Sequence, residues 1–185
     1  MLRSPSRKSK ALRPADIAAA FWGCGDLLAR ETNELVRLGV PVTALTEPFP
    51  VRVGYVVFDE LGFRFKPRGI NEVEGVRAFL FLITDKHGEV SDIVAWAPMV
   101  RRLSTWLNRA SALGEEAVGT AHPSSQSELR VWPTPLEWLQ AGREGLCFIR
   151  PAATILQFSA GNQSPAKDGA GAPSSASSGG CAGKR

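Results

Sequence analysis

The chain is poor in the side chains that most often form disulfides or bind metals, with three cysteines and two histidines among 185 residues. Cys24, Cys147 and Cys181 are widely spaced and form no Cys-x-x-Cys pair. This spacing excludes a disulfide framework and a zinc ribbon, and it fits a reducing compartment. His87 and His122 have no cysteine or carboxylate near them at the spacing of a zinc site. The sequence therefore predicts no metal site of this kind and no cofactor.

Long apolar runs are also absent, and no stretch is long enough to cross a bilayer. Residues 17–24 follow a basic start, but this run is short and is closed by Asp16 and Asp26. A secretory signal needs a longer apolar core and small residues before its cleavage site. Pro5 and Pro14 weaken the amphipathic helix that a mitochondrial transit peptide would form. We therefore expect a cytoplasmic protein that does not bind membranes.

Acidic residues are nearly absent from both ends of the chain, although the whole sequence carries 18 of them against 22 Lys and Arg. Five bases and no acid lie in residues 1–13, and three bases and one acid lie in residues 159–185. Subtracting both ends leaves 14 bases and 17 acids for residues 14–158, a net charge of −3. The basic arm predicts weak, salt-sensitive binding to nucleic acid, or only a solubilising terminus, whereas the body is mildly acidic.

Composition divides the chain into three parts. Residues 159–185 consist almost entirely of Gly, Ala, Ser and Pro, so they form a predicted disordered tail with little apolar surface to bury. Residues 1–13 are polar and basic and form a predicted flexible arm. Residues 14–158 are long enough to bury a single core, and all five Trp and all nine Phe lie there.

Apolar residues at helical spacing predict helices at 15–38, 99–113 and 135–142. The first two begin after prolines and end at glycines, as helices commonly do. The third begins with a capping box in which Thr134 precedes Glu137 by three residues, which is a specific signal for a helix start.

Alternating apolar residues predict an antiparallel meander of strands over residues 51–97. Residues 77–84 are continuously apolar, which is typical of a strand that is covered on both faces. Short strands are expected near 129–132 and 145–149. The predicted fold class is α+β, a mainly antiparallel sheet with helices packed on it.

Two hairpin turns of this meander, at residues 59–62 and 85–88, are the first candidate site. Alternate turns of a meander fall at the same end of the sheet, so these two turns are expected side by side. Carboxylates beside an imidazole suit a divalent metal or acid–base catalysis, although exposed turns are commonly made of the same residue types. The residues of this candidate catalytic site are Asp59, Glu60, Asp85 and His87.

Residues 63–68 are the second candidate, because aromatic and basic side chains alternate there. Alternation places Phe63 and Phe65 on one face of a strand and the bases on the other. Such a strip can hold phosphates, but an ordinary half-buried edge strand has the same pattern. The candidate nucleic-acid-binding residues of the arm and the strip are Arg3, Arg7, Lys8, Lys10, Arg13, Arg64, Lys66 and Arg68.

No motif in the chain names a reaction, and the serine-hydrolase elbow is absent. We expect a non-enzymatic accessory or interaction protein whose body binds a protein partner or itself, while the arm adds weak affinity for nucleic acid. Two alternatives remain: a small metal-dependent hydrolase that uses the two turns, and a dedicated nucleic-acid-binding protein. Tryptophan is enriched at interfaces, so the candidate anchors are Trp22, Trp96, Trp132 and Trp138.

Overall fold

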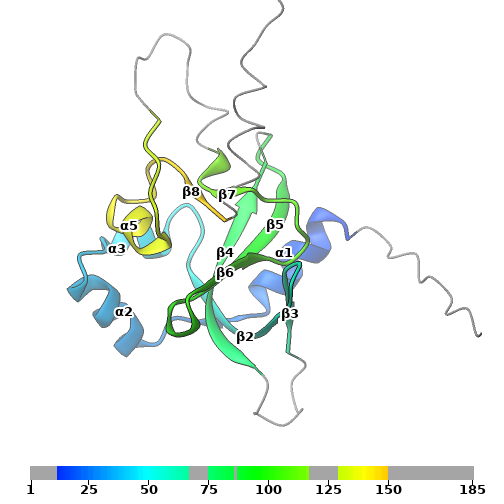
Figure 1. Cartoon of the computed structure of the whole chain (residues 1–185), viewed down its shortest axis with the longest axis horizontal. Coiled ribbons are helices and arrows are strands. Elements are labelled where there is room, and N and C mark those ends of the chain that lie inside the picture. Colours follow the sequence, from blue (N-terminus) through cyan, green and yellow to red (C-terminus); the bar gives the residue numbers. More distant parts are fainter. Residues whose placement is uncertain (1–11, 67–74, 86, 117–128, 150–185) are drawn as a thin grey trace, which may run out of the picture.

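The computed structural model describes residues 12–66, 75–85, 87–116 and 129–149. Within this part the protein is an α+β fold, with an antiparallel sheet of six strands and helices on both sides of it (Figure 1). The tail predicted at 159–185 lies outside the described residues, as do five of the predicted nucleic-acid-binding residues: Arg3, Arg7, Lys8, Lys10 and Arg68.

The main sheet has the strand order β1-β2-β4-β5-β6, and β3 pairs with β2 on the same edge as β1. A small second sheet pairs β7 with β8. The strands are β1 (Gly25–Asp26), β2 (Arg52–Phe58), β3 (Phe63–Phe65), β4 (Val76–Thr84), β5 (Val90–Ala97), β6 (Arg102–Thr105), β7 (Ala112–Leu113) and β8 (Cys147–Phe148). The helices are α1 (Pro14–Trp22), α2 (Ala29–Arg37), α3 (Val42–Thr46), the 3₁₀ turn η2 (Pro98–Val100) and α5 (Pro135–Gln140).

The central strands β4 and β5 are covered on both faces, as the continuous apolar run of residues 77–84 predicts. On one face Leu80 and Ile93 pack with Phe21 of α1. On the other face Phe81 and Val94 pack in the cluster that includes α3, α5, β7 and β8. Figure 1 shows α1 on the right of the sheet and α2, α3 and α5 on its left. Successive side chains of a strand point to opposite faces of the sheet. A strand that is covered on both faces therefore has apolar residues at successive positions and does not alternate between apolar and polar ones.

The single helix predicted for residues 15–38 is wrong, because the chain forms α1, β1 and α2 there. Gly23 ends α1, and Gly25 pairs with Val53 of β2. Glu31 then opens α2 by accepting a hydrogen bond from the backbone N–H of Leu28 at 2.8 Å. Glycines weaken a helix, and here the pairing of β1 with β2 replaces the helical hydrogen bonds at the break.

The helix predicted for residues 99–113 is also wrong, because this segment contains η2, β6 and β7. Arg101 adopts a left-handed backbone conformation with φ of 52°, which reverses the chain after η2. The following residues then pair with β5, from Arg102 opposite Ala97 to Thr105 opposite Val94. Residues with the apolar spacing of a helix therefore form a strand here. Pairing with β5 in the tertiary structure overrides the local helical propensity.

The predicted meander is wrong in its strand order, since β3 and β4 lie on opposite edges of β2. The short strand predicted near 129–132 is reduced to a single bridge between Val131 and Leu146. The strand predicted near 145–149 is confirmed as β8, and the helix predicted at 135–142 is confirmed as α5. The capping Thr134 accepts a hydrogen bond from the backbone N–H of Glu137 at 3.3 Å, as the capping box predicts.

Candidate functional site

The two hairpin turns that form the first candidate site lie at opposite ends of the sheet. Val56 near the end of β2 pairs with Val76 at the start of β4, so the turn at 59–62 lies where β4 begins. The turn at 85–88 follows the end of β4. The predicted convergence is therefore wrong, because β3 does not separate β2 from β4. Among the residues that the structure describes, no three His, Cys, Asp or Glu side chains are grouped to hold a metal ion.

Each aspartate of this candidate stabilises its own turn. Asp59 Oδ1 accepts hydrogen bonds from the backbone N–H groups of Leu61 and Gly62, at 2.9 and 2.8 Å. Asp85 Oδ1 accepts from the backbone N–H groups of His87 and Glu89, at 2.8 and 3.1 Å. Glu60 and His87 are exposed on these turns. The geometry thus assigns the aspartates a local role in turn formation, which is common for this residue type.

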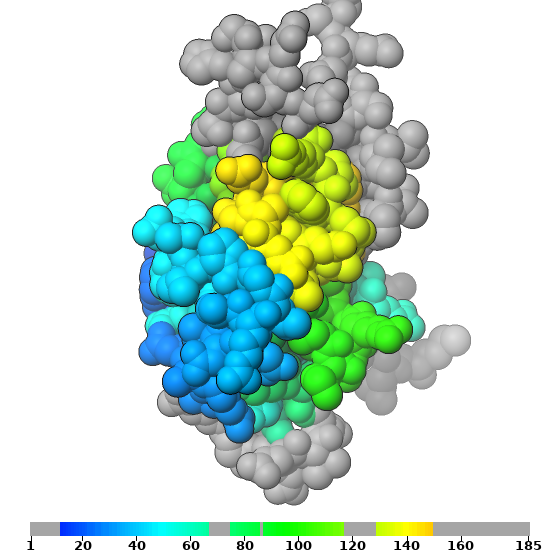
Figure 2. Space-filling view, turned by 90° about the vertical axis from the view of Figure 1, so that its left-hand side faces the viewer, coloured from blue at the N-terminus to red at the C-terminus, as the bar shows by residue number. Residues whose placement is uncertain are grey.

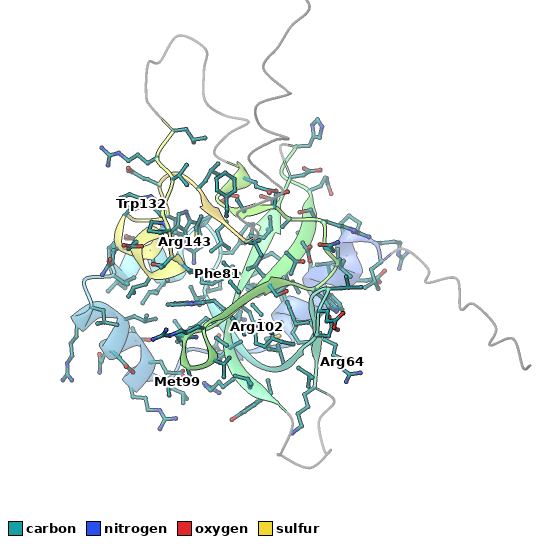
Figure 3. All side chains as sticks on the ribbon, viewed as in Figure 1. Arg64, Phe81, Met99, Arg102, Trp132 and Arg143 are labelled. Carbon is teal, nitrogen blue, oxygen red and sulfur yellow. The ribbon has the colours of Figure 1, made fainter. Side chains whose placement is uncertain are left out.

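In the described part of the aromatic and basic strip, residues 63–66, the side chains alternate between the two faces as the sequence predicts. Phe63 is buried, and the ring of Phe65 packs edge-on against Trp106 at 5.0 Å between centroids. Arg64 is exposed and points away from the sheet, and Lys66 is half-buried (Figure 3). Both phenylalanines therefore lie on the core side of β3, where their rings cannot stack on the nucleobases of DNA or RNA.

Arg13, the only basic residue of the arm that the structure describes, lies against the start of α1. Its guanidinium forms a salt bridge with Asp16 at 3.1 Å, and these hydrogen bonds lower the pKa of the Asp16 carboxyl. Nucleic-acid binding by the arm and the strip remains a prediction.

The four candidate tryptophans differ in exposure. Trp138 and Trp96 are buried, and Trp132 is half-buried with its Nε1 donating to the carbonyl oxygen of Glu144 at 2.7 Å. Trp22 is 48% exposed, and the guanidinium of Arg52 lies 5.3 Å from its ring centroid. Trp96, Trp132 and Trp138 therefore contribute to packing. Of the four, only Trp22 exposes about half of its surface to solvent.

A surface that the sequence did not predict carries most of the exposed apolar side chains. Eight of the eleven large apolar residues exposed in the described part belong to three segments: α2 with α3, η2, and the residues leading into α5. Figure 2 shows these segments, coloured blue to cyan, green and yellow-green, on one side of the molecule. We call this surface the exposed apolar face; its residues are Leu28, Val36, Leu38, Val42, Met99, Val100, Leu129 and Val131.

Ties to the sheet and between helices hold the elements of the exposed apolar face in place. Arg77 of β4 donates two hydrogen bonds to Glu31 of α2, at 2.6 and 2.9 Å, and these bonds lower the pKa of the Glu31 carboxyl. Gln140 Nε2 of α5 donates to the carbonyl oxygen of Leu38 at 2.5 Å. The helix α2 of this face is therefore tied both to the sheet and to α5.

η2 forms the most exposed part of this face. Met99 is 91% exposed and Val100 is 46% exposed, at the turn that joins β5 to β6. The backbone N–H of Arg101 donates to the carbonyl oxygen of Pro98 at 3.1 Å and closes the turn. Figures 1 and 2 both show this turn beside α2.

None of the helices in the described ranges is long and apolar enough to cross a bilayer.

A buried guanidinium lies beneath the face, between α5 and the sheet (Figure 3). Arg143 is 5.8 Å from the ring centroid of Phe81 and 5.6 Å from that of Trp138, and its Nε donates to the carbonyl oxygen of Ala44 at 2.6 Å. Burial lowers the pKa of Arg143 to about 10, so the side chain stays charged at neutral pH. Cation–π contact and the bond to α3 make Arg143 a structural link between α5 and α3.

Cys147 offers a test of how tightly β8 is packed. Burial raises the pKa of its thiol to about 12, whereas Cys24 is half-buried. At pH 8 the thiolate fraction of Cys147 is then on the order of a thousandfold below that of an ordinary cysteine. We expect iodoacetamide to leave Cys147 unmodified in the native protein, as measured by mass spectrometry of its peptide. Equal labelling in native and guanidinium-unfolded protein would contradict this packing.

Comparison with known proteins assigns the chain to no family: no family model, no curated protein and no solved structure matches it. No residue role is therefore transferred from a relative. The candidate site rests on the exposure and packing of this chain's own residues.

Proposed function

We propose that this is a non-enzymatic interaction protein that binds a protein partner through the exposed apolar face. The observation that carries the proposal is that eight of the eleven large exposed apolar side chains of the described part belong to three segments on one side of the molecule. Apolar residues scattered singly over a surface are ordinary, but an extended exposed patch is typical of an interaction site. Methionine is among the residues enriched in protein interfaces, and Met99 is the most exposed side chain of the set.

The contacts that hold α2 in place further support the proposal. A partner that binds a preformed surface loses less conformational entropy than one that must order its target. Here α2 is held by the Glu31–Arg77 salt bridge, and the hydrogen bond between Gln140 and Leu38 joins α2 to α5. Little reorganisation is therefore needed before a partner docks.

The two alternatives have less support. The hydrolase hypothesis needs the two turns to meet, and they lie at opposite ends of the sheet. The hypothesis of a dedicated nucleic-acid-binding protein needs exposed aromatic side chains beside Arg64 and Lys66. Phe63 and Phe65 pack inward instead. Weak binding by the basic arm is compatible with the proposed function and is tested by deleting residues 1–13.

Replacing Met99 and Val100 together with serine should weaken capture of the partner at least tenfold. Losing two apolar anchors at the centre of an interface commonly costs about 2 kcal/mol or more, and 1.4 kcal/mol corresponds to tenfold. The measurement is quantitative mass spectrometry of proteins retained from a lysate of the native cells by the immobilised full chain.

Leu61→Ser is the matched control, because Leu61 is 74% exposed in the turn between β2 and β3, apart from the exposed apolar face. The control should retain the captured proteins, and both variants should unfold at the temperature of the unmodified chain. Equal capture by the double variant, or equal loss in the control, would contradict the proposal. Sedimentation of the purified chain, alone and as the double variant, tests whether the partner is a second copy.

A further inference from the structure

We infer that the partner segment bound by the exposed apolar face is acidic as well as apolar; this inference rests on the proposed function. Three exposed arginines are interleaved with the apolar residues of the face. Arg37 lies between Val36 and Leu38, Arg101 follows Met99 and Val100, and Arg130 lies between Leu129 and Val131.

These three guanidiniums form no hydrogen bond or salt bridge with the part of the chain that the structure describes. Three other arginines are engaged, Arg52 with Asp26, Arg77 with Glu31 and Arg143 with Ala44, whereas Arg64, which lies outside the face, is exposed like the three of the face. Arg37, Arg101 and Arg130 are therefore available to a partner, and each is adjacent in sequence to an apolar residue of the face.

The chemistry of this arrangement favours carboxylates. A guanidinium binds a carboxylate through two parallel hydrogen bonds, and its weak hydration suits it to interfaces. When the neighbouring apolar side chains are covered, water is excluded from the ion pair and the attraction is strengthened. A partner segment that alternates acidic and apolar side chains would satisfy both features of the face together.

The distribution of charge favours a protein segment over a continuous anionic surface. Glu34, Glu47 and Glu144 are also exposed on α2, after α3 and after α5. A flat anionic membrane would repel these glutamates when it met the arginines. A short segment can place its carboxylates against the arginines alone, so the mixed charge of the face selects for a patterned partner.

The test is selection of a phage-displayed random library of twelve-residue peptides on the immobilised full chain. The recovered peptides should be enriched in Asp, Glu and large apolar residues. A synthetic copy of the best peptide should bind the double variant Arg37→Glu, Arg101→Glu at least tenfold more weakly, since charge reversal turns attraction into repulsion. Arg64→Glu is the matched control, because Arg64 is exposed on β3, outside the face, and this variant should bind as the unmodified chain does.

The outcomes separate this inference from the proposed function. Neutral or basic peptides that lose binding in the Met99→Ser, Val100→Ser variant would overturn the inference and leave the proposed function standing. Acidic peptides that bind the arginine variant unchanged would have the same effect. If no recovered peptide depends on Met99 and Val100, the proposed function fails and the inference with it. Co-sedimentation with phosphatidylserine vesicles that requires Arg37 and Arg101 would replace the protein partner with a membrane.

Discussion

Asp92→Asn should lower the free energy of unfolding by about 2–5 kcal/mol, the largest effect that we expect from a single polar substitution. The carboxylate is completely buried. Its Oδ1 accepts hydrogen bonds from the backbone N–H groups of Ile93 and Leu107, at 2.8 and 2.9 Å. Its Oδ2 accepts from those of Arg109 and Ala110, at 2.8 and 3.2 Å. An amide keeps one acceptor oxygen and turns an NH₂ donor toward the other pair of N–H groups.

This effect is large because Asp92 holds the segment that follows β6 against β5. Residues 106–110 have no regular secondary structure, so without the carboxylate their buried N–H groups would lack partners. Denaturant unfolding followed by fluorescence measures the change. Glu60→Gln, at an exposed turn, is the control and should alter stability by no more than about 0.5 kcal/mol. Unfolding of Asp92→Asn at the same denaturant concentration as the unmodified chain would refute this account.

Gly114→Ala is the second substitution with a large expected effect, a loss of about 3 kcal/mol or more. Gly114 has φ of +83°, a conformation that disfavours any Cβ. A Cβ there would also collide with the carbonyl oxygen of Gly145, to which Trp138 Nε1 donates a hydrogen bond at 3.1 Å. The obstacle is backbone, so relief requires the segments around β7 and β8 to separate from each other and from α5.

Gly88→Ala isolates the steric part of this prediction. Gly88 has a similar φ of +79°, but a Cβ there would meet no atom within 4 Å. This control should lose only about 1–2 kcal/mol, the cost of the left-handed conformation itself. The difference between the two variants in denaturant unfolding measures the collision at Gly145. Equal losses would mean that the contact is relieved by a small shift and that the packing of β7 and β8 is loose.

Local patterns in the sequence predicted three features of the fold correctly. The capping box at Thr134 predicted the start of α5, and the continuous apolar run of residues 77–84 predicted a strand covered on both faces. The alternation of residues 63–66 predicted which side chains of β3 face the core. In each case the signal lies in a short stretch of the sequence, either as a capping contact or as a periodicity of apolar residues.

Elements that depend on distant partners were predicted wrongly. Residues 99–113 have helical spacing, but β6 instead forms ladder hydrogen bonds by pairing with β5 along one edge. Gly23 and Gly25 lie within the helix predicted for residues 15–38, and they mark the entry to β1, which pairs with β2. Which edge of β2 receives β3 is likewise a tertiary choice, and it decides that the two turns lie at opposite ends of the sheet.

The sequence by itself determined the α+β class, the central strand covered on both faces, the start of α5 and the difference in net charge between residues 1–13 and residues 14–158. Only the tertiary structure decided the exposed apolar face, because its three segments are separated by more than fifty residues and more than twenty-five residues along the chain. Apolar residues such as Met99 and Leu38 have the same character in the sequence as those of the core. Whether they are buried depends on which elements pack over them, and local periodicity does not contain that information.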